Sequence, residues 1–287
     1  MNSPLRLRLM TRADLPFADS VRALAGWNQT FADWERFLAT EPDGCFVAEW
    51  NGAPAGTATT TVYGLELAWI GMVLVHPEYR RRGIGRALLE RCVEHLRSRG
   101  VRCLKLDATP LGKQVYDSLG FKDEWTMTRW VCPVTPPQTT TGELGLRSWR
   151  ATDAELIEPL DVAAFGVSRQ SLRRTLSRQS RCALVLAPAG NGIAGYGLLR
   201  AGSQAFYLGP VVAHSADAGR LLLDALVARA EGQRVFLDVP DRNAAAVAWT
   251  QERGCTTQRT LTRMFLGENL SPGNANLQFA LTGPETG

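Results

Sequence analysis

Apolar and polar positions in the first half of the chain follow two different periods. Short runs that are apolar at alternate positions or throughout predict β-strands. These runs span residues 5–10, 45–50, 55–63, 67–75, 102–107 and 121–131. Segments with apolar residues three or four positions apart predict helices. These segments span residues 14–24, 30–39, 83–99 and 111–119. The order predicts an α/β fold in which a mixed, mostly antiparallel sheet is flanked by helices.

A segment rich in proline and threonine interrupts this pattern near the middle of the chain. Residues 132–143 read CPVTPPQTTTGE and contain almost no apolar side chains. Such a segment continues neither a helix nor a central strand, so it predicts a linker. We therefore expect an N-terminal domain at residues 1–131 and a C-terminal domain at residues 144–287.

The two halves resemble each other weakly. LRLMTRADL near the start resembles LRSWRATDAEL after the linker. GRALL, from Gly85, resembles GRLLL, from Gly219, and a Leu-Asp pair follows in each half. Three similarities in the same order predict two tandem copies of one fold.

The composition excludes several classes of protein. With 287 residues, of which 45% are hydrophobic and 21% charged, the chain is typical of a globular protein with one large or two ordinary domains. A net charge of +4 fits a site for an anionic ligand better than a binder of genomic nucleic acid. The opening residues, MNSPLRLRLMTRADL, lack the apolar core of a signal peptide, and no apolar run approaches a membrane span. We expect a cytoplasmic protein.

The six cysteines lack metal or redox spacing, so we expect buried, reduced thiols and no metal site.

The stretch 72–89, MVLVHPEYRRRGIGRALL, runs from an apolar strand through a basic loop into a helix. The first turn of a helix presents unpaired N–H groups and the positive end of its dipole, which favour anions. Gly83 and Gly85 allow close approach to the backbone, and Arg80, Arg81 and Arg82 add positive charge. The stretch predicts a pyrophosphate site. The alternative is a solvated arginine cluster at the start of a helix.

The spacing Arg80-x-x-Gly83-x-Gly85 resembles the acetyl-CoA loop of the GNAT superfamily, the Gcn5-related N-acetyltransferases. Residues 106–121, LDATPLGKQVYDSLGF, resemble the strand, helix and turn that follow that loop. AGWNQT at 25–30 and WIGM at 69–72, with a degenerate second half, are similar to tandem GNAT proteins of the YitH-like kind. The resemblance covers residues 4–268.

This resemblance implies direct attack of an amine on the thioester of acetyl-CoA, without a metal. It also implies that the cofactor contacts a strand end, the basic loop and the turn before the next helix. The implied cofactor residues are Val73, Leu74, Val75, Arg80, Arg81, Arg82, Gly83, Ile84, Gly85, Arg86, Thr109 and Gly112. Tyr116 would protonate the departing thiolate. Its alternative role is that of a half-buried helix aromatic with a satisfied hydroxyl.

The general base is where the chain departs from the family. Several members carry a glutamate about eight residues before the proline that matches Pro77, and Trp69 stands there instead. Regular alternation would put Trp69 on the same face of its strand as Gly71, Val73 and Val75. Glu66, Glu124 and a water relay stay open as alternatives for the base.

Trp27, Asn28 and Trp69 are candidates for the acceptor pocket, since aromatic walls suit an apolar or cationic acceptor. The second half lacks the arginine run and the first loop glycine, and Thr250 stands where the first half has Tyr116. We therefore expect no second acetyl-CoA site.

Two functions compete. The first is an acetyl-CoA-dependent N-acetyltransferase acting on a small primary amine, as a monomer or homodimer. The second is a GNAT scaffold that binds acetyl-CoA as a sensor or structural ligand without turnover. A nucleic-acid binder ranks last, because the chain lacks a broad basic stripe with exposed aromatic residues.

Overall fold

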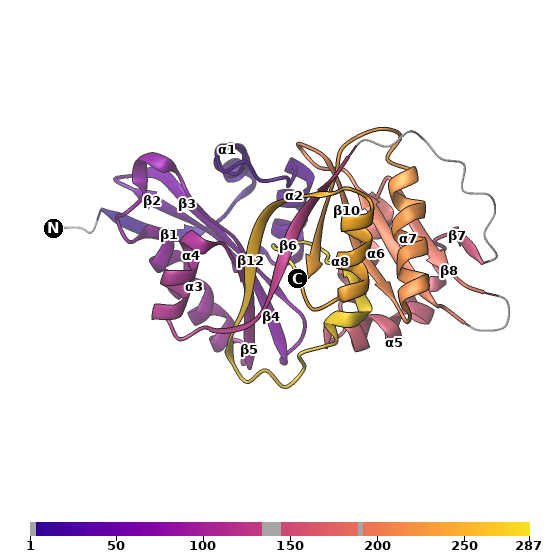
Figure 1. The fold of residues 1–287 in the computed structure, drawn as a ribbon. Coiled ribbons are helices and arrows are strands. Elements are labelled where there is room, and N and C mark those ends of the chain that lie inside the picture. Colours follow the sequence, from indigo (N-terminus) through magenta and orange to yellow (C-terminus); the bar gives the residue numbers. More distant parts are fainter. Residues whose placement is uncertain (1–3, 134–144, 189–191) are drawn as a thin grey trace. The chain divides into compact units, whose positions relative to one another are not determined.

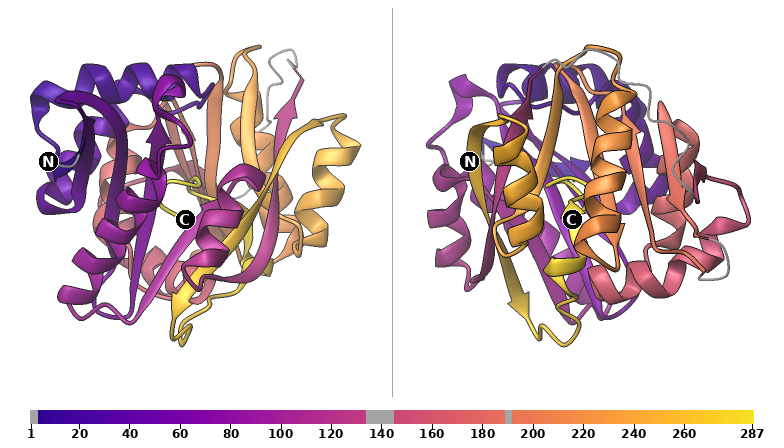
Figure 2. Two further views of the ribbon diagram at one scale, coloured as in Figure 1. Left: turned by 90° about the vertical axis from the view of Figure 1, so that its left-hand side faces the viewer. Right: turned by 45° about the vertical axis from the view of Figure 1, so that its right-hand side comes forward.

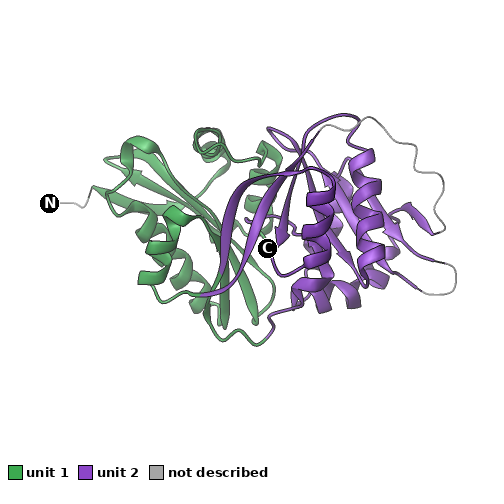
Figure 3. Cartoon of the chain, viewed as in Figure 1, with its two compact units in different colours: residues 1–122, 264–270, 286 green, residues 123–263, 271–285, 287 purple. Residues whose placement is uncertain are grey.

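The computed structural model describes residues 4–133, 145–188 and 192–287. These form two compact units (Figure 3). Unit 1 contains the residues up to 122 together with 264–270 and 286. Unit 2 contains residues 123–263, 271–285 and 287, apart from those outside the described ranges.

Unit 1 carries the elements of the first half of the chain (Figure 1). They are β1 (Leu5–Leu9), α1 (Leu15–Leu24), α2 (Phe31–Thr40), β2 (Cys45–Trp50), β3 (Ala53–Val62), β4 (Leu67–Val75), α3 (Ile84–Ser98), β5 (Cys103–Ala108) and α4 (Pro110–Ser118). Strands β1 to β4 pair antiparallel in sequence order, and β5 joins β4 in parallel. All the elements that the sequence predicts in the first half are present, with ends that shift by no more than two residues.

Two apolar layers hold unit 1 together, one on each face of its sheet. Helix α3 packs against one face through buried leucines such as Leu88 and Leu89. Helices α1 and α2 cover the other face, where Trp34 is fully buried against Met72 and Leu74 of β4. The predicted helices on both faces of a mixed sheet are therefore confirmed.

The rest of the chain forms β6 (Lys122–Cys132), β7 (Leu146–Ser148), α5 (Asp153–Phe165), α6 (Gln170–Gln179), β8 (Cys182–Leu186), β9 (Gly195–Arg200), β10 (Phe206–Ala213), α7 (Ala216–Ala228), β11 (Val235–Pro240), α8 (Ala244–Glu252), β12 (Thr256–Gly267) and β13 (Gln278–Ala280), which lie in unit 2 except for Lys122 and the end of β12. From β7 to β12 these elements repeat the order from β1 to β6. Helix α7 lies along β8, β9 and β10 (Figure 2), as α3 lies along the strands of unit 1.

The last long strand of each half is exchanged. Strand β6 pairs antiparallel with β11, from Cys132 opposite Val235 to Met127 opposite Pro240. The end of β12, from Met264, lies beside β5 in unit 1, where Met264 is buried in the α3 layer. The compact units therefore do not follow the expected boundary at residue 131, and most of the linker at 132–143 lies outside the described residues. The tandem domain limits stay a prediction.

A buried ion pair explains why β6 stays with unit 2. Arg129 of β6 donates two hydrogen bonds to Asp238 of β11, at 2.8 and 2.6 Å, and Tyr207 of β10 donates to the same carboxylate at 2.8 Å. All three side chains are buried. Separating β6 from β11 would leave uncompensated charges in an apolar interior, which is strongly unfavourable.

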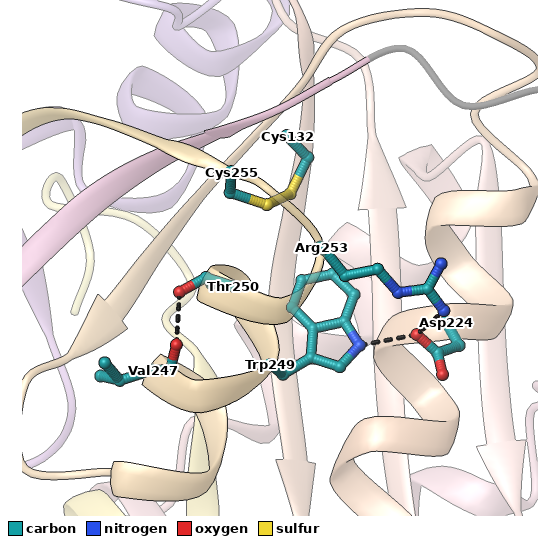
Figure 4. Close-up of a disulfide and its surroundings, with 7 residues drawn as sticks. All are labelled: Cys132, Asp224, Val247, Trp249, Thr250, Arg253 and Cys255. Atoms are coloured by element: carbon teal, nitrogen blue, oxygen red, sulfur yellow. Dashed lines mark hydrogen bonds and ion pairs between the residues drawn. A yellow bond between two sulfur atoms is a disulfide. The ribbon is translucent and has the colours of Figure 1, made fainter.

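The expectation of reduced thiols is wrong for two of the six cysteines. Cys132 at the end of β6 and Cys255 just before β12 form a disulfide (Figure 4). Sequence spacing could not indicate this pair, because 123 positions separate the two residues. Among the free cysteines, Cys45, Cys92 and Cys103 are buried thiols as expected, and burial raises the pKa of Cys45 to about 12.

Candidate functional site

Strand β4 carries a bulge at the position where the site begins. Its register against β3 shifts between Thr57 and Thr59, and Met72 takes a left-handed φ of 50°. The hydroxyl of Thr57 donates to the carbonyl of Met72 at 2.9 Å in the buried interior, which holds the bulge in place. Such irregularities redirect side chains and end strand pairing next to active sites.

The bulge overturns the expected alternation along β4. Val73 and Val75 pack toward the α3 layer together with Ile70, whereas Met72 and Leu74 pack toward α1 and α2. Trp69 therefore lies on the opposite face from Val73 and Val75, because the inserted residue reverses the alternation.

The pairing of β4 with β5 ends just before the bulge. Among the described residues, their parallel pairing covers Leu67–Trp69 on β4 and Cys103–Lys105 on β5, although both strands continue. Beyond this point the edge of β4 that faces β5 is not paired with β5, so its backbone groups can hydrogen-bond to other partners. The stretch Val73–Val75 lies in this part of β4.

The basic loop connects β4 to the N-terminus of α3. Gly83 is the N-cap residue with φ 78°, and no side chain caps the helix there. A Cβ atom at Gly83 would meet nothing within 4 Å, and one at Gly85 would meet only Val75 Cγ2 at 3.5 Å. The helix start is therefore open and uncapped, which suits the close approach of an anion. Ile84 buries its side chain in the core, so it can offer only its backbone N–H.

The arginines of the loop are exposed and differ in their contacts. Arg80 Nε donates to the carbonyl of Val75 at 3.3 Å. The guanidinium of Arg82 lies over the rings of Trp50 and Tyr79, at 5.1 and 5.6 Å. Arg81 has a φ of 62°, a backbone conformation that is unfavourable for a non-glycine residue and common at functional sites.

Arg86 forms a link between α3 and α4 that sequence reasoning missed. Its Nη1 donates to Ser118 Oγ at 3.1 Å, and its Nε donates to Glu90 at 2.8 Å. No local pattern indicates the contact with Ser118, because 32 residues separate the two.

Tyr116 packs into the same region from α4. Its ring is half-buried against the α3 layer, and burial raises the pKa of its hydroxyl to about 12. A Cβ atom at Gly112 would lie 3.1 Å from the Tyr116 hydroxyl, so glycine is needed for the tyrosine to lie across the first turn of α4. Thr109 caps that turn by accepting from Gly112 N at 3.2 Å. The structure thus brings Thr109, Gly112 and Tyr116 together.

The three acceptor candidates are less accessible than expected. Trp69 is fully buried and Asn28 is 4% exposed, whereas Trp27 is half-buried against the α1–α2 layer. An acceptor that touches Trp69 would need side chains to move. Their assignment to the pocket stays a prediction.

Glu66 is exposed, and its Oε1 lies 3.5 Å from Nη2 of Arg102. The two side chains therefore form a solvated ion pair at the start of β4. Glu124 lies on β6, in unit 2.

The corresponding positions of unit 2 have different chemistry. Ser215 caps α7 by accepting from Ala218 N at 3.3 Å, and Asp217 lies in the first turn. Thr250, the counterpart of Tyr116, is buried and donates to the carbonyl of Val247 in its own helix at 2.7 Å (Figure 4). An occupied cap and a carboxylate oppose an anion at this helix start.

No cluster of three or more His, Cys, Asp or Glu side chains that could hold a metal occurs among the described residues. Within the same ranges, no helix combines the length and apolar character needed to cross a membrane.

Comparison with known proteins tests the resemblance. The pattern of the acetyltransferase (GNAT) family matches residues 10–121, and that of an acetyltransferase (GNAT) domain matches residues 157–280. The chain is 37% identical over 131 residues to the [ribosomal protein bS18]-alanine N-acetyltransferase of Escherichia coli, covering 42% of this chain and 83% of that protein. The chain belongs to the GNAT acetyltransferase family. Both of its halves are GNAT domains, as the repeat predicted.

Two further similarities extend beyond the first half of this GNAT protein. It is 29% identical over 180 residues to the uncharacterized N-acetyltransferase YitH of Bacillus subtilis, and the match covers 62% of each chain. The match thus spans less than two thirds of YitH. A crystal structure of a putative acetyltransferase from Pyrococcus horikoshii superimposes with a TM-score of 0.84 at 24% identity, covering 100% of this chain and 97% of that one. At that identity the likeness concerns the fold.

Proposed function

We propose that unit 1 binds acetyl-CoA and transfers its acetyl group to a small primary amine. The observation that carries this proposal is the separation of β4 from β5 beside the uncapped start of α3. A separated strand edge suits the amide groups of the pantetheine arm, and the helix start with its three arginines suits the pyrophosphate. The proposed contacts are those that the family resemblance implies: Val73–Val75, Arg80–Arg86, Thr109 and Gly112.

The reaction needs a neutral amine, an electrophilic thioester and a donor for the leaving sulfur. The amine nitrogen attacks the acetyl carbonyl carbon, a C–N bond forms, the C–S bond breaks and the thiolate leaves. Backbone N–H groups of β4 can stabilise the charge that develops on the carbonyl oxygen. Tyr116 donates its O–H proton to the departing sulfur and regains a proton from solvent, which takes up the amine proton, and its raised pKa keeps it protonated at neutral pH.

The amine proton has three candidate routes: Glu66, Glu124 and a water relay. Trp69 cannot accept a proton, and Glu66 is exposed and paired with Arg102. A water relay to bulk solvent therefore takes precedence over Glu66 and Glu124 as the proposed route. Under this scheme the fraction of the amine that is already unprotonated in solution reacts. The protein then contributes mainly the positioning of the two reactants.

Thiol release from acetyl-CoA across a panel of amines tests the proposal. The panel includes a peptide with an N-terminal alanine, since that is the acceptor in the name of one relative. We expect at least one amine to raise thiol release, and Tyr116→Phe to lower kcat by about 10²–10⁴-fold. Thr250→Val, at the counterpart position of unit 2, is the matched control and should leave the rate unchanged.

The second candidate is an acetyl-CoA sensor without turnover. The replacement of the usual glutamate by Trp69 favours it. Acetyl-CoA binding without thiol release for any amine would support the sensor. Unchanged acetyl-CoA affinity in both Arg81→Ala and Gly83→Asp would instead show that the site is misassigned.

A further inference from the structure

The C-terminal segment of the chain adds a strand to unit 2 at an unusual place. Strands β10 and β11 pair in parallel only at Phe206–Tyr207 and Val235–Phe236 among the described residues, and then separate. Strand β13 pairs antiparallel with β10 just beyond that point, with Ala280 opposite Val211. Leu281 N donates to the carbonyl of Asp238 on β11 at 2.8 Å. The segment therefore bridges two separated strands.

This place corresponds to the proposed acetyl-CoA groove of unit 1. Gly195 of β9 lies opposite Ala213, and a Cβ atom there would meet Leu222 of α7 at 2.7 Å. Gly56 of β3 lies opposite Val75, and a Cβ atom there would meet Leu88 of α3 at 3.1 Å. The two environments match, so Ala213 corresponds to Val75. Counting back, the two partners of β13 on β10 correspond to Val73 and Leu74.

Phe279 of β13 fills the position next to the start of α7. A Cβ atom at Gly219 would lie 2.4 Å from three atoms of the Phe279 ring, and the phenylalanine is 2% exposed. Gly219 is the counterpart of Gly85, which lies beside the proposed pyrophosphate site. The aromatic ring thus lies next to the start of α7, which is capped by Ser215 and has Asp217 in its first turn, so it does not favour an anion.

A third contact comes from the N-cap residue of α8. Asn243 Nδ2 donates to the carbonyls of Gln278 at 2.9 Å and Asn276 at 3.1 Å, while its Oδ1 accepts from Ala246 N. Its counterpart is Thr109, the N-cap residue of α4, which is a proposed cofactor contact. The C-terminal segment therefore touches unit 2 at the counterparts of the strand, helix start and cap that unit 1 offers to acetyl-CoA.

We propose that residues 275–283 are a built-in occupant of the cofactor-type groove of unit 2. The groove holds the protein's own strand in place of an acyl-CoA, so the chain has a single acyl-CoA site, in unit 1. That this groove is of the cofactor-binding type rests on the proposed function of unit 1. The position of residues 275–283 in the structure is independent of that function.

Buried polar groups fasten the segment beyond β13. Arg200 donates to the carbonyl of Thr282, while the Tyr207 hydroxyl, which donates to Asp238 at 2.8 Å, lies 3.2 Å from the carbonyl of Leu281. Arg169 donates to the Thr282 hydroxyl at 2.5 Å. Both arginines are buried, and losing the Thr282 acceptors would leave buried N–H groups unsatisfied, so the segment is expected to stay in place.

A matched pair of glycine substitutions tests the position of residues 275–283 without any ligand. Gly219→Ala places a methyl group against the Phe279 ring, and we expect it to lower the Tm and to accelerate amide exchange of residues 278–281 at least tenfold. Gly85→Ala is the control at the counterpart position, where the methyl group meets only Val75 at 3.5 Å. It should leave the Tm unchanged or raised, because alanine favours a helix more than glycine does.

The same variants can contradict the proposal. If the segment lay elsewhere, Gly219→Ala would behave like Gly85→Ala, with an unchanged or raised Tm and no change in exchange at 278–281. Phe279→Ala supplies a second check. Combined with Gly219→Ala it should lower the Tm no further than Phe279→Ala alone, and additive losses would count against contact between the two residues.

Equilibrium dialysis with acetyl-CoA separates this inference from the proposed function. We expect one equivalent per chain in the wild type. Two equivalents would overturn the built-in occupant. No binding at all would overturn the proposed function, while the exchange data on 278–281 would still decide where the segment lies.

Discussion

A buried aspartate joins the first strand to the first helix in each half of the protein. Asp14 accepts two hydrogen bonds from Arg8, at 2.8 and 2.7 Å, and Asp153 accepts two from Arg147, both at 2.7 Å. The guanidinium of Arg8 lowers the pKa of Asp14 from 3.8 to about 2, and Arg147 lowers the pKa of Asp153. The same Arg–Asp ion pair thus occurs at matching positions of the similar segments LRLMTRAD and LRSWRATD.

The Asp14 pair should stabilise the protein in a pH-dependent way. Because the folded-state pKa is below the unfolded value, the contribution is fully present above about pH 4 and is lost as the pH falls through about 2. We expect Asp14→Asn to lower the free energy of unfolding by about 1–2 kcal/mol at pH 7. Urea denaturation across pH 2–7 measures this. The exposed Asp43→Asn is the control, and a wild-type to Asp14→Asn difference that persisted unchanged at pH 2 would contradict the linkage.

The pH profile of acetyl transfer should reflect the amine rather than the protein. Tyr116 has a pKa raised to about 12, so its hydroxyl stays protonated until well above the range in which most amines lose their proton. We expect kcat/KM to rise with pH up to the pKa of the acceptor amine and to show no fall due to Tyr116 below about pH 11. Profiles with two amines of different pKa measure this. If the rise of kcat/KM had its midpoint at the same pH for both amines, the titrating group would be a base on the protein instead.

Among the elements, the loop between β4 and α3 contains both conformational strain and positive charge. Two left-handed residues, Arg81 at φ 62° and Gly83 at φ 78°, turn the chain so that α3 begins with an uncapped, open N-terminus. This conformation is costly for most residues but leaves the first N–H groups of α3 free for an anion.

Two glycines with similar geometry separate binding from stability in this loop. Gly83 and Gly52 have φ values of 78° and 82°, and a Cβ atom at either would meet nothing within 4 Å. We expect Gly83→Ala and Gly52→Ala each to lower the free energy of unfolding by about 1 kcal/mol. Only Gly83→Ala should also weaken acetyl-CoA binding, by about tenfold or more. Calorimetric titration measures this, and equal affinities for the two variants would exclude the loop from the site.

At the scale of the whole molecule, the second half is cross-linked as well as packed. The Cys132–Cys255 disulfide ties the end of β6 to the start of β12 within unit 2. Trp249 of α8 packs nearby and donates to Asp224 of α7 at 2.6 Å, and Arg253 pairs with the same carboxylate (Figure 4). The cross-link closes a loop of 123 residues, so it restricts the unfolded chain strongly.

Reduction should therefore lower the stability of unit 2. The loop-closure argument gives about 3–5 kcal/mol for a cross-link of this span. We expect a reductant to lower the urea midpoint of the wild type, and Cys132→Ser with Cys255→Ser to be insensitive to the reductant. An unchanged wild-type midpoint after complete reduction, verified by thiol titration, would contradict this role for the disulfide.

The first half was readable from the sequence because its signals are local. Alternation and helical spacing depend on neighbouring residues, so the strands and helices from β1 to β6 were predicted within two residues. The same alternation failed for Trp69 against Val73 and Val75, because the bulge at Met72 depends on the hydroxyl of Thr57 on another strand. Cys132 and Cys255 were likewise assigned wrongly, because their pairing depends on how β6 and β12 meet in space.

The sequence by itself determined the element order, the repeat, the GNAT resemblance and the basic loop at a helix start. Each of these depends on short-range patterns or on chemistry within a few residues. Only the tertiary structure decided which strand completes each sheet, where β4 leaves β5, which cysteines join and what fills the groove of unit 2. Those features depend on non-local backbone pairing and on the burial of particular side chains such as Arg129 and Phe279, and no local pattern encodes either.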